Sequence, residues 1–283
     1  MEVLRYTAFS SDPSGGNPAG VVLDASGVTE AQMLAAAAEI GYSETAFLIR
    51  RGPTGFDVRY FSPRAEVPFC GHATIAAGAA LAERHGGGDY TFHTMAGPVA
   101  VVTHAGAHGA SATLTSVVPS VAGLDDADVA TLLAALHWDA SDLSPQLPPR
   151  VAYAGAYHPI LAVRSRERLA ALDYDFGALD ALMAARRWTT VDLVWREAAT
   201  SFHARNPFPP GGVVEDPATG AAAAAFGGYL RTLGLIDVPA SITVEQGYDL
   251  GRPSRIDVDI PADEALGIDV SGAAVAIPAG VGA

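Results

Sequence analysis

One stretch of the chain, residues 61–83, joins chemically capable side chains to a helix that must be buried. Cys70, Gly71 and His72 stand directly before an Ala-rich run that is apolar almost all the way round, and such a helix is predicted to be enclosed on every side. A buried helix start needs partners for its first N–H groups, and neither Cys70 nor Gly71 is a good cap, although Thr74 offers weak help. The pattern predicts a bound anion at this helix start.

A second stretch repeats the pattern later in the chain. Residues 61–64 align loosely with 202–205, residues 67–74 align with 213–220, and an apolar helix follows in each case. Chance similarity between Ala-rich helices is the alternative, but the flanking elements come in the same order, which favours duplication. Two lobes, each with strands around one buried helix, would place a helix N-terminus on each wall of a cleft. Such a cleft favours a carboxylate ligand.

The surrounding elements must position these groups. Glu44 is the first residue of a strand predicted over residues 44–49, so its carboxylate is expected at the N-terminal end of that strand. Thr29, with Gln32 three residues on, predicts a capping box for a helix that ends at Gly41. The second buried helix is expected over residues 221–233, and a further helix over 167–187 is expected to break near Gly177.

The order of elements predicts an α+β protein with two similar lobes. The N-terminal lobe is expected over residues 1–118, and a connector with a helix at 126–138 is expected over 119–149. The C-terminal lobe is expected over 150–283, with its last strand a candidate to return to the first lobe. The Pro-rich residues 144–149 suggest the boundary.

Composition excludes several classes of protein. The 283 residues carry a net charge of -14, which argues against nucleic acid as a partner. No apolar run reaches membrane-spanning length, and the N-terminus lacks the layout of a secretory signal. Cys70 is the single cysteine and cannot form an internal disulfide, so a cytoplasmic location is expected.

Seven motifs spread along nearly the whole chain carry a resemblance to a known family. They are residues 15–21, 42–47, 61–63, 66–74, 215–220, 245–247 and 251–254. In this order they resemble the PhzF family of phenazine-biosynthesis isomerase-like proteins, which shares the diaminopimelate epimerase fold. The resemblance implies two pseudo-symmetric lobes, each a barrel-like, mainly antiparallel sheet around a central helix. It also implies a homodimer that uses neither a metal nor an organic cofactor.

The resemblance also implies an activity and a set of site residues. The family's named reaction is isomerisation of trans-2,3-dihydro-3-hydroxyanthranilate, a proton shift in a small cyclic amino acid. Carried over by motif, Glu44 is the acid/base, and His72 and Asp216 are its polar companions. The residues implied to bind the substrate carboxylate at the two helix starts are Gly71, Ala73, Thr219, Gly220 and Ala221.

The chemistry is consistent with these residue types. Moving a proton between carbons needs a group that accepts and returns it, and a carboxylate in a closed cleft can do both. Burial is expected to raise the pKa of Glu44 toward working pH. His72 could donate to developing negative charge, and Asp216 could hold His72 or a substrate amine.

Two departures bear on the substrate. Related epimerases use two opposed cysteines, but this chain has only Cys70, which excludes a two-thiol racemase. Many relatives have Ser where this chain has Ala221, so a hydroxyl is lost. The alternatives are a non-catalytic small-molecule binding protein of the same fold and an epimerase of another metabolite.

Each candidate residue also has a purely structural interpretation. Glu44 could be a solvated strand-end carboxylate, His72 a helix-start residue bonded to backbone, and Asp216 a cap for a helix that begins at Pro217. Cys70 is interpreted as a small buried hydrophobe. The remaining histidines have no metal-ligand spacing, and no metal site is predicted; they are His85, His93, His104, His108, His137, His158 and His203.

Overall fold

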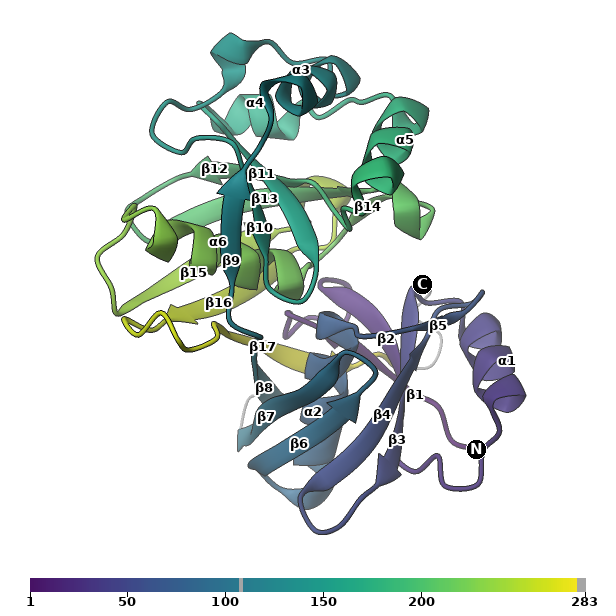
Figure 1. Ribbon diagram of the computed structural model, residues 1–283. Coiled ribbons are helices and arrows are strands. Elements are labelled where there is room, and N and C mark those ends of the chain that lie inside the picture. The colour runs from purple at the N-terminus through teal and green to yellow at the C-terminus, as the bar shows by residue number, and fades with distance from the viewer. Residues whose placement is uncertain (107–108, 279–283) are drawn as a thin grey trace. The chain divides into compact units, whose positions relative to one another are not determined.

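The computed structural model describes residues 1–106 and 109–278, and they form two compact units (Figure 1). Unit 1 comprises Met1–Thr115, Gly251–Arg255 and the chain from Val270 onwards. Unit 2 comprises Ser116–Leu250 and Ile256–Asp269. The chain therefore enters unit 1 three times. No helix among the described residues is long and apolar enough to cross a membrane.

Eight strands of unit 1 close into a barrel. Its strands, with the short β5, are β1 (Leu4–Ala8), β2 (Asn17–Val22), β3 (Glu44–Arg50), β4 (Gly55–Phe61), β5 (Glu66–Val67), β6 (Gly88–Thr94), β7 (Gly97–Gly106), β8 (Gly109–Thr115) and β17 (Asp269–Ala276). Pairing runs from β1 through β2, β3, β4, β6, β7, β8 and β17 back to β1. The pairs β2–β3 and β4–β6 are parallel, because a helix crosses over between their strands. The last strand of the chain thus completes the first unit.

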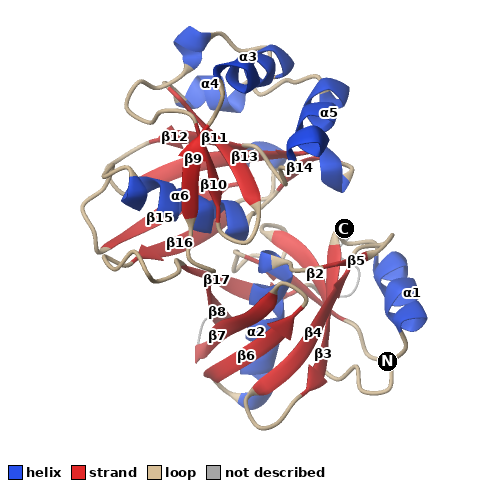
Figure 2. Ribbon diagram, viewed as in Figure 1, coloured by secondary structure: helices blue, strands red, loops and turns tan. Residues whose placement is uncertain are grey.

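Helix α2 (Gly71–His85) fills this barrel, as Figure 2 shows. Every residue from His72 to Ala82 is buried, as the lack of a polar face predicts. Small side chains let the helix approach the strands closely. A Cβ added at Gly78 would lie 2.7 Å from the Cβ of Ala112 in β8.

Helix α1 (Glu30–Ile40) packs on the outside of unit 1. Thr29 and Gln32 form the predicted capping box, and Gly41 ends the helix in the left-handed region with φ 74°. Met33 and Ala37 are its buried residues, and they pack in one cluster with Phe47 of β3. The sequence prediction for this helix is confirmed.

Unit 2 repeats the pairing order. Its strands are β9 (Ser120–Gly123), β10 (Arg150–Tyr153), β11 (Tyr157–Val163), β12 (Asp192–Arg196), β13 (Ser201–Phe208), β14 (Val213–Asp216), β15 (Ala240–Gln246) and β16 (Ser254–Ile260). The pairs β10–β11 and β12–β13 are antiparallel, whereas β11–β12 and β13–β15 are parallel. The strands β1, β2, β3, β4 and β6 of unit 1 show the same alternation of antiparallel and parallel pairs. The predicted repeat is therefore confirmed.

Helix α6 (Gly220–Thr232) is the buried helix of unit 2, with its residues from Ala222 to Arg231 buried. Three helices, α3 (Asp126–Ala135), α4 (Arg166–Ala170) and α5 (Phe176–Arg186), cover the outer face of β11 and β12. The helical break expected near Gly177 is misplaced, since the chain leaves the helix after Ala170 and Gly177 lies inside α5. The strand pairing also corrects the predicted alignment of residues 61–64 with residues 202–205. Phe61 pairs with the second residue of β3 and Arg205 pairs with the second residue of β12, so Phe61 corresponds to Arg205.

Candidate active site

Glu44, Cys70 and His72 meet in unit 1, where strand β3 begins and helix α2 begins. The Glu44 carboxylate Oε2 lies 3.4 Å from His72 Nε2 and 3.6 Å from Cys70 Sγ. Cys70 Sγ lies 3.3 Å from His72 Nδ1. The side chains of His72 and Glu44 are 7% and 15% exposed. A carboxylate, an imidazole and a thiol therefore lie next to one another in a largely buried place, which is where groups that exchange protons are found.

A hydrogen-bonded chain fixes the start of α2. The Thr74 hydroxyl donates to the Cys70 carbonyl over 2.7 Å, so the Tyr60 hydroxyl, 2.6 Å from the same oxygen, must be the donor to Thr74. Cys70 is the N-cap and makes no side-chain capping bond. The first helical bond runs from the Thr74 amide to the Cys70 carbonyl. The amides of Gly71, His72 and Ala73 precede it, which is the feature that favours an anion.

The three side chains are also of metal-ligand types, with donor atoms within 4.8 Å of one another. The sulfur of Cys70 lies 3.3 Å from Nδ1 and 3.7 Å from Nε2 of His72, so it sits beside the ring. These three residues would be the ones to hold a metal ion, and the same side-chain types also suit proton exchange.

Asp216, the third predicted site residue, belongs to unit 2 and ends strand β14. It does not cap a helix at Pro217, because α6 begins at Gly220 with Thr219 as N-cap. The Thr219 hydroxyl donates to Asp216 Oδ2 over 2.6 Å, and the Thr219 amide donates to Gln246 Oε1 over 3.0 Å. Thr219 therefore offers no free amide to a substrate, whereas the amides of Gly220 and Ala221 precede the first helical bond. The approach of Asp216 to Glu44 and His72 stays a prediction.

Strand register identifies a second carboxylate that the sequence interpretation missed. Glu44 opens β3 opposite Ala19, and Asp192 opens β12 opposite Ile160, so the two acids hold equivalent places in the repeat. Asp192 is 2% exposed, and burial raises its pKa to about 7, against a smaller lowering by the bond from Asn206. The Asp192 carboxyl group therefore changes its protonation state near neutral pH.

Asp192 ends a buried polar chain. Asn206 Nδ2 donates to Asp192 Oδ1 over 3.1 Å, and the Thr190 hydroxyl donates to Asn206 Oδ1 over 2.7 Å. Since that hydroxyl proton is committed, Thr190 must accept from His158 Nδ1 at 2.9 Å. Burial lowers the pKa of His158 to about 4, so the ring is neutral. The chain therefore holds neutral groups beside Asp192.

Two motifs that are far apart in the sequence have a structural role in unit 1. Arg252 donates to the carbonyls of Gly15 and Gly16 over 2.7 and 2.8 Å, and the Gly16 amide donates to the Pro253 carbonyl. Gly16 has φ 65°, and a Cβ there would lie 2.3 Å from the Ala8 carbonyl oxygen. These residues hold the start of β2, the strand that pairs with β3 and so places Glu44.

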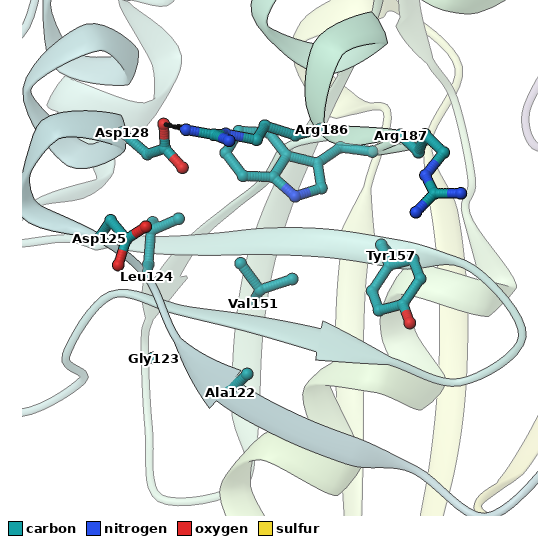
Figure 3. A pocket seen from close by; sticks show the side chains of 10 residues that line it. Ala122, Gly123, Leu124, Asp125, Asp128, Val151, Tyr157, Arg186 and Arg187 are labelled. Atoms are coloured by element: carbon teal, nitrogen blue, oxygen red, sulfur yellow. Dashed lines mark hydrogen bonds and ion pairs between the residues drawn. The ribbon is translucent and has the colours of Figure 1, made fainter.

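A cavity of about 290 Å³ on unit 2 contains none of the predicted site residues (Figure 3). Asp128 and Arg186 on one wall form an ion pair of 2.9 Å, and Arg187 extends away from that pair. Tyr157 lies near Arg187 on another part of the lining. The acid/base groups described above lie elsewhere in the fold.

The fold defines the class of protein: the chain has the diaminopimelate epimerase-like fold. A family model described as "Phenazine biosynthesis-like protein" matches residues 6–280. The chain belongs to this PhzF family, and it is an isomerase. Both the predicted family and the predicted fold are confirmed.

Relatives and solved structures agree. The chain is 32% identical to an uncharacterized isomerase, YddE, of Escherichia coli O157:H7, over 97% of this chain and 95% of the relative. It is 30% identical to the trans-2,3-dihydro-3-hydroxyanthranilate isomerase of Pseudomonas chlororaphis, over 94% and 93%. The PhzF-family crystal structure from Bacillus anthracis superposes with a TM-score of 0.87 at 27% identity, covering 98% of both chains. A probable proline racemase, at 14% identity and a TM-score of 0.65 over 96% and 90% of the two chains, shares the fold.

Three members of these clusters lay outside the predicted site. Cys70 was interpreted as a buried hydrophobe, yet its sulfur contacts both Glu44 and His72. Ser43 places its hydroxyl 3.3 Å from His72 Nε2. Gln246 bonds both Asp216 and Thr219. Cys70, Ser43 and Gln246 all fall within the matched motifs, which was the one signal in the sequence that could have identified them. Of the histidines set aside, His108 lies outside the described residues.

Proposed function

We propose that this isomerase shifts a proton within a small carboxylate without a cofactor, and that Glu44 carries the proton. The observation that supports this most directly is the Glu44 carboxylate 3.4 Å from His72 Nε2 beside the uncapped start of α2. The relative from Pseudomonas chlororaphis names a candidate substrate, trans-2,3-dihydro-3-hydroxyanthranilate. A cyclic amino acid of this kind has the carboxylate that a helix start favours.

The proposed reaction uses one group in two states. The Glu44 carboxylate takes a proton from one carbon of the substrate, and the resulting carboxylic acid gives it to another carbon, so the enzyme returns to its starting state. Negative charge that develops on the substrate between these steps is stabilised by His72, a potential donor beside Glu44. The amides at the starts of α2 and α6 are proposed to bind the substrate carboxylate, and Asp216 to bind a substrate amine. A homodimer and a cytoplasmic location remain predictions.

An epimerase of another metabolite is the second candidate, because Cys70 gives the cluster a second group able to exchange a proton. Its thiol lies 3.6 Å from the Glu44 carboxylate and 3.3 Å from a nitrogen of His72. An epimerisation would invert one carbon, whereas the proton shift moves a hydrogen between atoms. Chiral chromatography of the product distinguishes the two reactions.

Incubation in heavy water tests the role of Glu44. The protein is incubated with trans-2,3-dihydro-3-hydroxyanthranilate and with a panel of small amino acids, and products are followed by mass spectrometry and NMR. Glu44→Gln keeps the shape of the side chain but cannot accept the proton, so turnover and deuterium uptake should fall at least about 100-fold. Glu39→Gln, on the exposed side of α1, is the matched control and should behave as wild type. Unchanged turnover in Glu44→Gln would refute the assignment.

A further inference from the structure

A buried glutamine, Gln246, binds the turn that carries Asp216. Gln246 ends strand β15 and is 1% exposed. The turn runs from Asp216, at the end of β14, to Thr219, the N-cap of α6. Gln246 Nε2 lies 2.7 Å from the Asp216 carbonyl oxygen and 3.0 Å from Thr219 Oγ1. Its Oε1 lies 3.0 Å from the Thr219 amide nitrogen.

Two of these partners determine which way the Gln246 amide faces. The Thr219 backbone N–H can only donate, so the group it meets must be the Gln246 oxygen. The Asp216 carbonyl can only accept, so the group it meets must be the Gln246 nitrogen. The direction of both bonds therefore follows from backbone chemistry.

The next bond in the chain is fixed by the first two. The second hydrogen of the Gln246 amide points to Thr219 Oγ1, which must accept it. The Thr219 hydroxyl proton then points to Asp216 Oδ2, 2.6 Å away, a length typical of a bond to a charged oxygen. Asp216 Oδ2 accepts this proton, and a hydrogen bond donated to a carboxyl group favours its charged form.

We infer that Gln246 is a positioning residue that holds Asp216 as a carboxylate through Thr219. The inference rests on the proposed function only in making Asp216 a site residue. An aspartate held in this way is a hydrogen-bond acceptor and a negative charge, and it suits a substrate that presents an ammonium or another donor.

Three residues on or beside the turn and its neighbouring strands have defined positions. Glu215, the residue before Asp216, bonds to Arg205 of β13. Glu245, the residue before Gln246, stands opposite His203 in the β13–β15 pair. The backbone partner of Asp216 across β13 is Asn206, which does not titrate. The Thr219 hydroxyl is thus the group through which Gln246 acts on the Asp216 carboxylate.

An NMR titration of the whole protein, with aspartate carboxyl carbons labelled with ¹³C, tests the inference without any substrate. The Asp216 signal is assigned by its loss in Asp216→Asn. Thr219→Val removes the donated proton at nearly constant shape, so the titration midpoint of Asp216 should rise by about one to two pH units. Thr219→Ser restores the donor and should return the midpoint to within about 0.3 units of wild type.

Two further variants complete the design. Gln246→Met keeps an unbranched side chain of similar length, adds no charge and cannot donate to Thr219 Oγ1, so it should also raise the Asp216 midpoint. Thr243→Val removes another Thr–Asp bond of unit 2, from Thr243 to Asp257 over 3.1 Å, and should leave Asp216 unchanged. An Asp216 midpoint that does not rise in Thr219→Val, or that rises equally in Thr219→Ser, overturns the inference. If Thr219→Val does not fold, the Gln246→Met midpoint decides, and an unchanged midpoint in that variant overturns the inference. Loss of the Glu44 assignment would not alter any of these readings.

Discussion

Replacing Asp192 with Asn should stabilise the protein at high pH and have little effect at low pH. Burial raises the pKa of Asp192 from 3.8 to about 7. Between these values the folded chain holds a proton that the unfolded chain has released. Stability contributed by this group is therefore present below about pH 4 and is lost as the pH rises through about 7.

The size of the effect follows from the shift. Each pH unit between the two pKa values corresponds to about 1.4 kcal/mol, so the free energy of unfolding should fall by about 4 kcal/mol between pH 4 and pH 8 on account of Asp192. Asn at position 192 cannot ionise, and its side-chain oxygen can still accept the bond from Asn206. Asp192→Asn should thus match wild type below about pH 4, exceed it by about 1.6 kcal/mol at pH 5 and exceed it by up to about 4 kcal/mol at pH 8.

Urea unfolding followed by tryptophan fluorescence measures the difference. All three tryptophans, Trp138, Trp188 and Trp195, belong to unit 2, the unit that contains Asp192. Comparing the two proteins at each pH cancels the opposite contribution of His158, whose lowered pKa costs stability as the pH falls from 6.5 through about 4. Asp173→Asn, at a side chain that is 90% exposed, is the control. A stability difference for Asp192→Asn that is the same at pH 5 and pH 8 would refute the argument.

Two substitutions test the packing of the two units. Gly78→Ala should destabilise unit 1 by about 1–2 kcal/mol in a thermal melt, because the new Cβ would lie 2.7 Å from that of Ala112 and the strain exceeds the gain in helix propensity. The control is Gly177→Ala, where the new Cβ would have no atom nearer than 3.6 Å. This variant should be neutral or stabilising in the same measurement. Arg205→Met leaves the 1% exposed Glu215 side chain without its ion-pair partner and should cost about 3–5 kcal/mol in urea unfolding. The double variant with Glu215→Met should recover most of that loss, and a double variant as unstable as the single one would contradict the assignment.

Local sequence signals predicted the helices well. The capping box at Thr29 and the left-handed Gly41 depend on neighbours within four residues, so the sequence alone contains them. The all-apolar faces of α2 and α6 require enclosure whatever the strand order, and the barrel around α2 supplies it. The repeated order of elements predicted two similar units.

Contacts between distant residues could not be predicted in the same way. Asp216 was predicted as a site residue, with a cap next to Pro217 as its structural alternative. Helix α6 begins at Gly220, close to the predicted start at residue 221, and the bond from Gln246 to the intervening turn is the contact that no local signal contains. From the sequence alone, Cys70 is interpreted as a small apolar residue. Its contact with Glu44 depends on the position of β3 in the folded sheet. Propensity scales describe single segments, and these bonds join segments whose register only the folded sheet sets.

The two equivalent carboxylates, Glu44 and Asp192, differ in the access and the neighbours that the proposed proton transfer requires. Glu44 and Asp192 open corresponding strands, but the Glu44 side chain is 15% exposed and meets Cys70 and His72. Asp192 is 2% exposed, with Asn206 as its hydrogen-bond partner. A group that must exchange protons with a substrate needs access and an exchanging neighbour, and Glu44 has both. Glu44→Gln should therefore change turnover, whereas Asp192→Asn should change the pH dependence of stability, and the reverse pattern would assign the chemistry to the other repeat.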